Sequence, residues 1–226
     1  MMLSGNGVVG IWNGIANEGR LDFYQWHIHE HMPERTDIPG FLRGRRYRAA
    51  DAYTHPEFFT LYEVDEFDVL IGPEYAKRLN APTAWTRRAT SHFLNTSRGL
   101  ARVLYSGGAG PGGAVATVRF ELPSEAPKDA VDELTDVLKA LSKAPLLTGA
   151  HLCRSDDDAT QAKTAETRKE SDYDAPPAWF IVLEGCSIEA LWSPTQSILQ
   201  HPYVSRPRIG RYQLEYTRLK TETAAG

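Results

Sequence analysis

Three of the seven histidines in this chain lie within five residues, inside the segment WHIHEHMPER that begins at Trp26. Side chains four residues apart share one face of a helix, so we expect His27 and His31 to lie together and His29 to face elsewhere. A helix ends or bends near a proline, so Pro33 predicts that His31 lies beside a helix C-terminus. The helix dipole raises the pKa of an imidazole there, which predicts a histidine that can donate and accept protons.

Two alternatives account for the same cluster. Exposed histidines together with Glu30 could simply solvate a helix face, because short motifs match by chance. The spacing also fits the His-x-x-Glu-His pattern of one class of zinc proteases. That site needs a long helix and a further ligand, whereas Pro33 follows His31 closely and no downstream acidic motif stands out. We therefore expect no metal site.

Composition limits the classes of partner. The chain has 226 residues with 42% hydrophobic and 24% charged residues, as is ordinary for a soluble globular protein. A net charge of -4 and a pI near 6.0 argue against nucleic-acid binding. No apolar run could span a membrane, and the N-terminus lacks a signal-peptide pattern. Cys153 and Cys186 have no metal-like spacing, which fits a reducing compartment, so we expect a cytoplasmic protein.

Hydrophobic patterning predicts the same order of elements twice, with five glycines and one proline between Ser106 and Gly113 as a linker. In the first half we expect strand Gly7–Ile15, helix Gly19–Met32, strands Phe41–Ala49 and Glu57–Val64, helix Phe67–Leu79 and strand Ser91–Tyr105. In the second half we expect strand Ala114–Leu122, helix Lys128–Leu141, strands Leu147–Arg154 and Ala178–Glu184, helix Ile188–Leu199 and strand Arg208–Leu219.

The two halves also align in sequence. Phe58–Glu63 matches Trp179–Glu184, and Gly44 matches Gly149, which sets Arg45 and Arg46 against Ala150 and His151. Chance alignment of short strands is the alternative. The repeated order predicts an α+β fold of two tandem ferredoxin-like β-α-β-β-α-β units, with antiparallel sheets packed as an α+β barrel. We expect a site-bearing unit at 1–106, a linker at 107–113 and a mainly scaffolding unit at 114–226. The acidic, polar stretch 155–177 is expected to be a mobile surface loop.

The candidate site lies in the first half, because the first helix of the second half has no histidine. We expect His31 to move a proton, while His27 holds its tautomer or shares the work. Arg43 or Arg45 could hold a carboxylate or enolate oxygen, and Asn13 could donate a hydrogen bond. An aromatic pocket suits a flat, apolar ligand, although each ring could equally be core packing. The aromatic candidates for binding the substrate are Trp26, Tyr47, Tyr62 and Trp85.

At these residues the chain resembles the dimeric α+β barrel superfamily and, within it, EthD-type proteins. The resemblance rests on Trp26–Pro33, on Ile38–Tyr47 (IPGFLRGRRY), on the aromatic strand Phe58–Glu63 and on Pro82–Arg88 (PTAWTRR). It implies ferredoxin-like units whose sheets form a barrel, which the two halves could build internally while leaving room for a homodimer. It also implies that His31 matches the motif histidine. The superfamily includes cofactor-free monooxygenases, cyclases, isomerases and lyases, as well as haem enzymes.

The residues and the resemblance together predict a cofactor-independent enzyme for a small aromatic or carbonyl compound. Histidine-mediated proton transfer could serve an isomerase, a cyclase, a lyase or dehydratase, or a monooxygenase. A haem-binding enzyme of the tandem barrel type is one alternative, with His151 or His201 as axial ligand. A non-catalytic accessory protein that binds a small ligand in the same aromatic pocket is the other.

Overall fold

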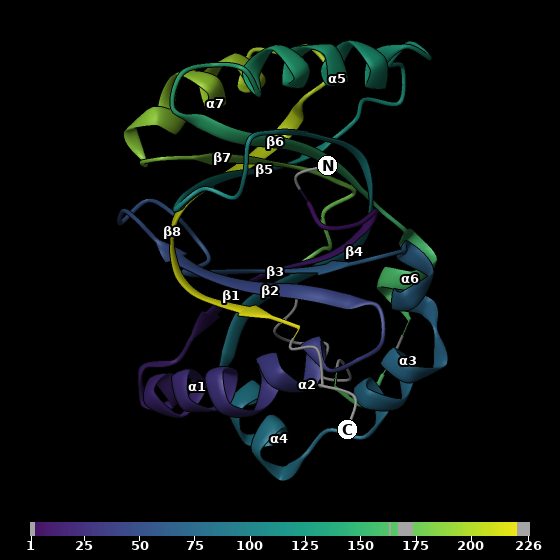
Figure 1. Ribbon diagram of the computed structural model, residues 1–226, viewed down its shortest axis with the longest axis vertical. Coiled ribbons are helices and arrows are strands. Elements are labelled where there is room, and N and C mark those ends of the chain that lie inside the picture. The colour runs from purple at the N-terminus through teal and green to yellow at the C-terminus, as the bar shows by residue number, and fades with distance from the viewer. Residues whose placement is uncertain (1–2, 163, 167–173, 221–226) are drawn as a thin grey trace.

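A computed structural model describes residues 3–162, 164–166 and 174–220. Within these residues eight strands close into one antiparallel barrel, in the order β1-β3-β2-β8-β5-β7-β6-β4. Each half of the chain therefore contributes four strands, and the fold is two ferredoxin-like units packed as an α+β barrel (Figure 1). The strands are β1 (Gly7–Ile15), β2 (Phe41–Ala49), β3 (Phe58–Val64), β4 (Phe93–Gly108), β5 (Ala114–Glu121), β6 (Leu147–Ser155), β7 (Trp179–Gly185) and β8 (Ser205–Leu219).

Helices cover the outside of the barrel on two opposite sides (Figure 1). One side carries α5 (Ala130–Leu141) and α7 (Trp192–Leu199), and the other carries the helices of the first half. These are α1 (Arg20–Trp26), a π-helical turn η2 (His27–His31), α2 (Met32–Thr36), the 3-10 turn η3 (Phe67–Ile71), α3 (Pro73–Asn80) and α4 (Ala84–Thr90). Shorter segments are η1 (Asn17–Gly19), α6 (Asp157–Gln161) and η5 (Glu189–Leu191).

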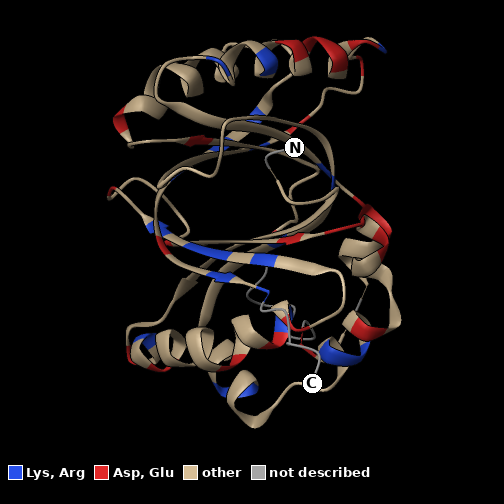
Figure 2. Cartoon of the chain, in the orientation of Figure 1, with Lys and Arg blue, Asp and Glu red and all other residues tan. Residues whose placement is uncertain are grey.

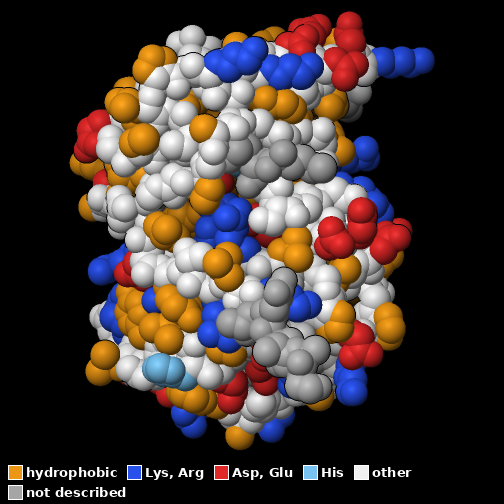
Figure 3. Space-filling model, viewed as in Figure 1, with side chains coloured by type: hydrophobic (Ala, Val, Ile, Leu, Met, Phe, Trp, Pro, Cys, Tyr) orange, Lys and Arg blue, Asp and Glu red, His pale blue; other side chains and the backbone are white. Residues whose placement is uncertain are grey.

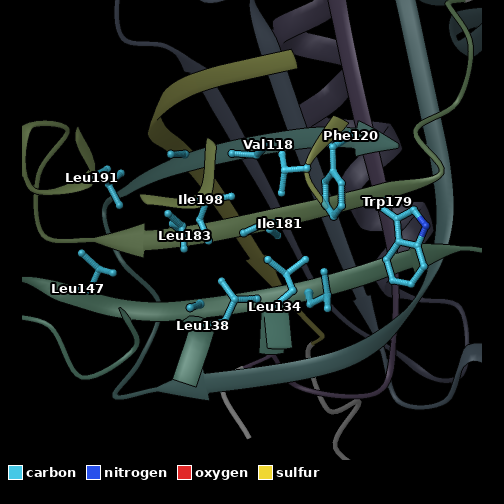
Figure 4. Close-up of a cluster of buried hydrophobic side chains, with 14 of the residues drawn as sticks. Val118, Phe120, Leu134, Leu138, Leu147, Trp179, Ile181, Leu183, Leu191 and Ile198 are labelled. Atoms are coloured by element: carbon cyan, nitrogen blue, oxygen red, sulfur yellow. The ribbon is translucent and has the colours of Figure 1, made fainter. Parts of the chain in front are cut away.

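The core has layers inside and outside the barrel. Apolar side chains of β5, β6 and β7 pack under α5 and α7, as the labelled side chains Val118, Leu134 and Ile181 illustrate (Figure 4). A second cluster fills the barrel interior and includes Trp12 and Phe180. Charged side chains also lie inside the fold, where Arg45 contacts both Glu63 and Glu184. The barrel interior is therefore a packed core with buried ion pairs rather than an open channel.

The sheet register corrects one part of the sequence alignment. Gly44 pairs with Tyr62 on β3, and Ala150 pairs with Leu183 on β7. Tyr62 and Leu183 occupy the same position in the aligned segments Phe58–Glu63 and Trp179–Glu184. Gly44 is thus equivalent to Ala150, not to Gly149, and Arg45 is equivalent to His151. The one-residue difference matters because neighbouring residues of a strand point to opposite faces.

The sequence predicted that the first helix ends at Met32, but the helical segment continues past Pro33. The backbone N–H of Met32 bonds to the carbonyl of His27, so one wider turn spans His27–His31, and the helix continues to Thr36. Proline has no N–H and its ring crowds the carbonyl one turn earlier. A π-helical turn shifts the hydrogen-bond register, which accommodates the proline without ending the helix.

Two further segments differ from the expectations. β4 continues through Gly107 and Gly108, which pair with Ala150 and Gly149, so the connection to β5 is 109–113. The predicted loop 155–177 contains α6, while its residues 163 and 167–173 lie outside the described residues. The division of the chain at 106 and 113 stays a prediction. No helix in the described part of the chain is both long and apolar enough to cross a bilayer.

The four arginines of β2, which are Arg43, Arg45, Arg46 and Arg48, form ion pairs within the fold. Figure 2 shows these arginines as a row along the strand. Arg43 bonds to Glu63, Arg46 to Glu215 and Arg48 to Glu57. On the face shown in Figure 3, charged side chains of both signs are interspersed.

Candidate functional site

A small cavity lies between the outer face of the first-half strands and the helices that cover them. Its volume is about 40 Å³, and His31, Arg35, Tyr62 and Thr96 are among its lining residues. Each of these four carries a buried polar atom that has no hydrogen-bond partner within the described residues: His31 Nδ1, Arg35 Nη1, Tyr62 Oη and Thr96 Oγ1. Buried polar atoms are nearly always paired, so their grouping marks a place for a polar ligand. The other lining residues are Ile11, Trp26, Tyr75, Leu79, Thr90, Phe93, Arg98 and Glu166.

A chain of hydrogen bonds orients the wall beside His31. The Trp26 ring packs on the imidazole of His31, with centroids 4.3 Å apart. Trp26 Nε1 donates to Thr86 Oγ1 at 3.1 Å, and Thr86 Oγ1 donates to Glu30 Oε1 at 3.2 Å. Thr83 Oγ1 also donates to Glu30 Oε1 at 2.6 Å. Because Glu30 belongs to the same turn as His31, these bonds tie α4 to that turn and fix the indole against the imidazole.

His31 is a buried, neutral imidazole. His31 belongs to a helical segment that continues beyond it, and the residue is 4% exposed. Burial lowers the pKa of His31 well below its ordinary value, and the nearby Arg35, His27 and Arg98 lower it further. The predicted rise in this pKa is therefore wrong, because His31 is not at a helix C-terminus. A neutral imidazole can accept a proton, which is the form that a general base requires.

His27 shares the helix face of His31, as the spacing predicted. The two rings stack with centroids 5.5 Å apart, while His29 is exposed. Arg46 Nη1 lies 3.3 Å from His27 Nδ1. A guanidinium can only donate, so Nδ1 accepts and the ring proton is assigned to Nε2. His27 is thus a stacked neighbour of His31, and it does not line the cavity.

The structure does not bring Arg43, Arg45 and Tyr47 to His31. A Cβ at Gly44 would lie 2.5 Å from Met32 Sδ and 2.9 Å from a Tyr62 ring carbon, so this position faces the helices. Its neighbours on β2 therefore face the barrel interior. There Arg45 bonds to Glu184 and the Tyr47 ring stacks on Phe59. These three residues belong to the internal packing of the barrel.

Of the remaining predicted site residues, two line the cavity and two do not. Trp26 and Tyr62 line the cavity with His31. Asn13 is buried and donates to the carbonyl of Gly14 at 3.3 Å, away from the cavity lining. Trp85 donates to Asp22 at 2.9 Å and packs at the edge of the aromatic cluster that contains Phe23 and Trp26, but it does not line the cavity.

Three charged residues of the site were not predicted. Arg35 pairs with Glu166, and Arg98 Nη2 donates to Tyr75 Oη at 2.9 Å. Arg35 lies four residues after His31, so helical spacing would have found it had the helix been extended past Pro33. No short-range pattern marks Arg98 or Glu166, which reach the cavity from β4 and from the 155–177 stretch.

Neither of the two histidines expected as haem ligands lies at the His31 cavity. His151 is buried, with Nδ1 2.9 Å from Ser106 Oγ and Nε2 3.2 Å from Glu184 Oε1, so neither ring nitrogen is available. His201 packs against Tyr203 beyond α7 and does not line the His31 cavity. That cavity holds about 40 Å³, whereas sites for larger organic ligands span roughly 300–1,000 Å³. Among the described residues no group of three His, Cys, Asp or Glu side chains could hold a metal ion.

No protein-family model matches the chain, and no match is found among curated proteins. Solved structures match nearly its whole length. An anthrone oxidase-like protein is 13% identical with a TM-score of 0.63, covering 98% of this chain and 96% of that one. A candidate monooxygenase of Fusobacterium nucleatum is 9% identical with a TM-score of 0.59, covering 96% and 95%. A haem-binding protein of Thermus thermophilus is 9% identical with a TM-score of 0.52, covering 94% and 92%. At these identities the likeness shows the fold alone.

Proposed function

We propose that this protein is a cofactor-independent enzyme that removes a proton from a small aromatic or carbonyl compound, with His31 as the general base. The observation that supports this most strongly is the grouping of four unpartnered buried polar atoms in the described chain, one of which is Nδ1 of the neutral His31. The resemblance to EthD-type proteins at Trp26–Pro33 adds support, because it assigns the motif histidine to His31. Isomerisation, cyclisation, elimination and oxygenation can all follow from such a proton transfer.

Charge in the cavity suits a substrate that becomes an anion. Arg35 and Arg98 both lower the pKa of His31, so a proton on the imidazole alone is unfavourable. When the proton comes from the substrate, the resulting enolate or phenolate offsets that repulsion and pairs with the guanidinium groups. Burial raises the pKa of Tyr62 well above its ordinary value, so its hydroxyl stays protonated. Tyr62 can therefore donate a hydrogen bond to the developing oxyanion.

The size of the cavity limits which part of a substrate enters. A volume of about 40 Å³ accommodates a polar group such as a carbonyl rather than a whole aromatic ring. The ring system of the substrate must therefore extend from the cavity or displace a lining side chain. The carboxylate of Glu166 accepts a hydrogen bond from Arg35. An anionic oxygen of the substrate would therefore compete with Glu166 for Arg35.

Anthrone is a suitable probe, since one structural neighbour is described as anthrone oxidase-like. Removal of a methylene proton from anthrone moves negative charge to its carbonyl oxygen. Exchange of that methylene with D₂O, followed anaerobically by proton NMR, measures proton removal separately from any oxidation. The comparison requires the wild type, His31→Gln and a control variant, His29→Gln, in which an exposed histidine of the same turn is replaced.

We expect the wild type and His29→Gln to accelerate the exchange, and His31→Gln to lose roughly 10²-fold or more of that acceleration. Equal exchange in the wild type and His31→Gln would contradict the proposed role of His31. Saturable binding of anthrone without exchange would favour the non-catalytic ligand-binding alternative.

A further inference from the structure

We propose a second ligand site at a mouth of the barrel, where buried Arg119 binds the carboxylate of a small organic anion. Arg119 lies on β5, and its guanidinium carbon is 5.0 Å from the ring centroid of Trp12 in the barrel interior. This position is separate from the His31 cavity, which lies outside the sheet under the first-half helices. The inference does not depend on the proposed enzymatic function.

Arg119 differs from the other buried arginines of the described chain. Arg35 pairs with Glu166, Arg45 with Glu184 and Arg46 with Glu215. Arg119 is 5% exposed and has no ion-pair partner among the described residues. Its Nε and Nη1 lack any hydrogen-bond partner there, and its Nη2 makes only a long bond of 3.4 Å to the carbonyl of His55. Burying a cation without a counterion costs free energy. An anionic ligand bound at Arg119 would supply the missing negative charge.

A cavity of about 250 Å³ opens beside Arg119. Its rim carries two exposed arginines, Arg206 and Arg208, which pair with Glu121 and Asp174 at 3.2 Å and 3.1 Å. The rim charges are therefore largely neutralised, and Arg119 remains the uncompensated charge. This balance favours a ligand with a single negative charge.

The walls of this cavity are partly apolar. Ala175, Pro176, Pro177 and Ala178 form one continuous segment of the lining. A carboxylate on a ring or short aliphatic body would place its charge at Arg119 and its apolar part against this segment. Inorganic phosphate has no apolar part and prefers to stay hydrated. We therefore expect an organic carboxylate to bind more tightly than phosphate.

Calorimetric titration of the full-length protein with sodium benzoate at low ionic strength tests this site. Arg119→Met removes the charge with little change in volume. Arg154→Met is the matched control, because Arg154 stacks over Trp179 at 5.4 Å in a similar way but is exposed. We expect saturable benzoate binding with a Kd below about 10 mM in the wild type and in Arg154→Met, and at least about tenfold weaker binding in Arg119→Met.

A wild type that does not bind benzoate would overturn the proposal, as would undiminished binding by Arg119→Met. Tighter binding of phosphate than of benzoate would contradict the carboxylate assignment. If Arg119→Met fails to fold, the Nε NMR signal of Arg119 in the wild type decides the question. The proposal requires that signal to shift with benzoate, and a signal that does not respond would refute it.

Discussion

The imidazole rings of His27 and His31 stack inside the fold, with centroids 5.5 Å apart and ring planes 30° apart. Their stacking follows from the four-residue spacing and from the π-helical turn that lets the helix pass Pro33. Burial and neighbouring cations lower the pKa of both rings well below the ordinary value of about 6.5. The site is therefore built around two neutral histidines, of which His31 lines the cavity.

The two neutral histidines should make the fold less stable in acid. The unfolded chain binds protons at its histidines near pH 6.5, whereas the folded chain binds them only at lower pH. The free energy of unfolding should therefore be unaffected by these groups above pH 6.5 and should fall below it. The slope is up to about 1.4 kcal/mol per pH unit for each histidine. Urea unfolding at several pH values measures it, and an unchanged slope in His27→Gln/His31→Gln would contradict the shifted pKa values.

The variant Tyr62→Phe should weaken ligand binding or exchange without lowering the stability of the fold. The Tyr62 hydroxyl is buried without a partner in the described chain, so its removal should leave the free energy of unfolding unchanged or slightly higher. The same variant should weaken anthrone binding or exchange by about tenfold, because one hydrogen bond to the oxyanion is lost. Urea unfolding and the exchange assay provide the two readouts. A stability loss of more than about 2 kcal/mol would show that the hydroxyl is structural.

Arg45 should be essential for stability, while Arg48 on the same strand should not. Arg45 is 1% exposed and holds the buried carboxylates of Glu63 and Glu184. Arg45→Met leaves both carboxylates without this partner and should cost about 3–5 kcal/mol. Arg48 pairs with Glu57 at the surface, so Arg48→Gln should cost about 0–1 kcal/mol. Similar losses in the two variants, measured by urea unfolding, would contradict this difference.

Gly44→Ala tests the packing of β2 against the site. The added Cβ would lie 2.5 Å from Met32 Sδ and 2.9 Å from Tyr62, so both side chains must move. We expect a loss of about 1–3 kcal/mol from overpacking, together with weaker ligand binding. Gly113→Ala is a matched control, since its Cβ meets nothing closer than Gln213 Nε2 at 3.7 Å. Equal stability of the two variants would argue against close contact at Gly44.

Local sequence patterns predicted the elements and part of the site. The grouping of His31 with Trp26 and Tyr62 came from helical spacing and aromatic content. Arg35 was missed because Pro33 was expected to end the helix, and a π-helical turn has no simple sequence signature. Arg43 and Arg45 were assigned to the site because a guanidinium can hold a carboxylate or enolate oxygen, but the structure places both on the face of β2 that lines the barrel interior. Alternation shows which residues share a face but not which face the helices cover.

Contacts between distant segments account for the remaining differences. Thr96 and Arg98 reach the cavity through the pairing of β4 with β1, and Glu166 reaches it from the 155–177 stretch. Neither contact follows from local spacing, because the partners are far apart in the sequence. The one-residue error between Gly149 and Ala150 arose because Gly44 was aligned to a glycine, whereas the register depends on strand pairing.

The pH dependence of anthrone exchange tests the central claim most directly. If neutral His31 is the base, the rate should decrease only at pH values well below 6.5, because the proton that blocks the base binds with the lowered pKa. This acid limb should be lost, together with the catalysed exchange, in His31→Gln and retained in His29→Gln. An acid limb at or above pH 6.5, or one unaffected by replacing His31, would contradict the account.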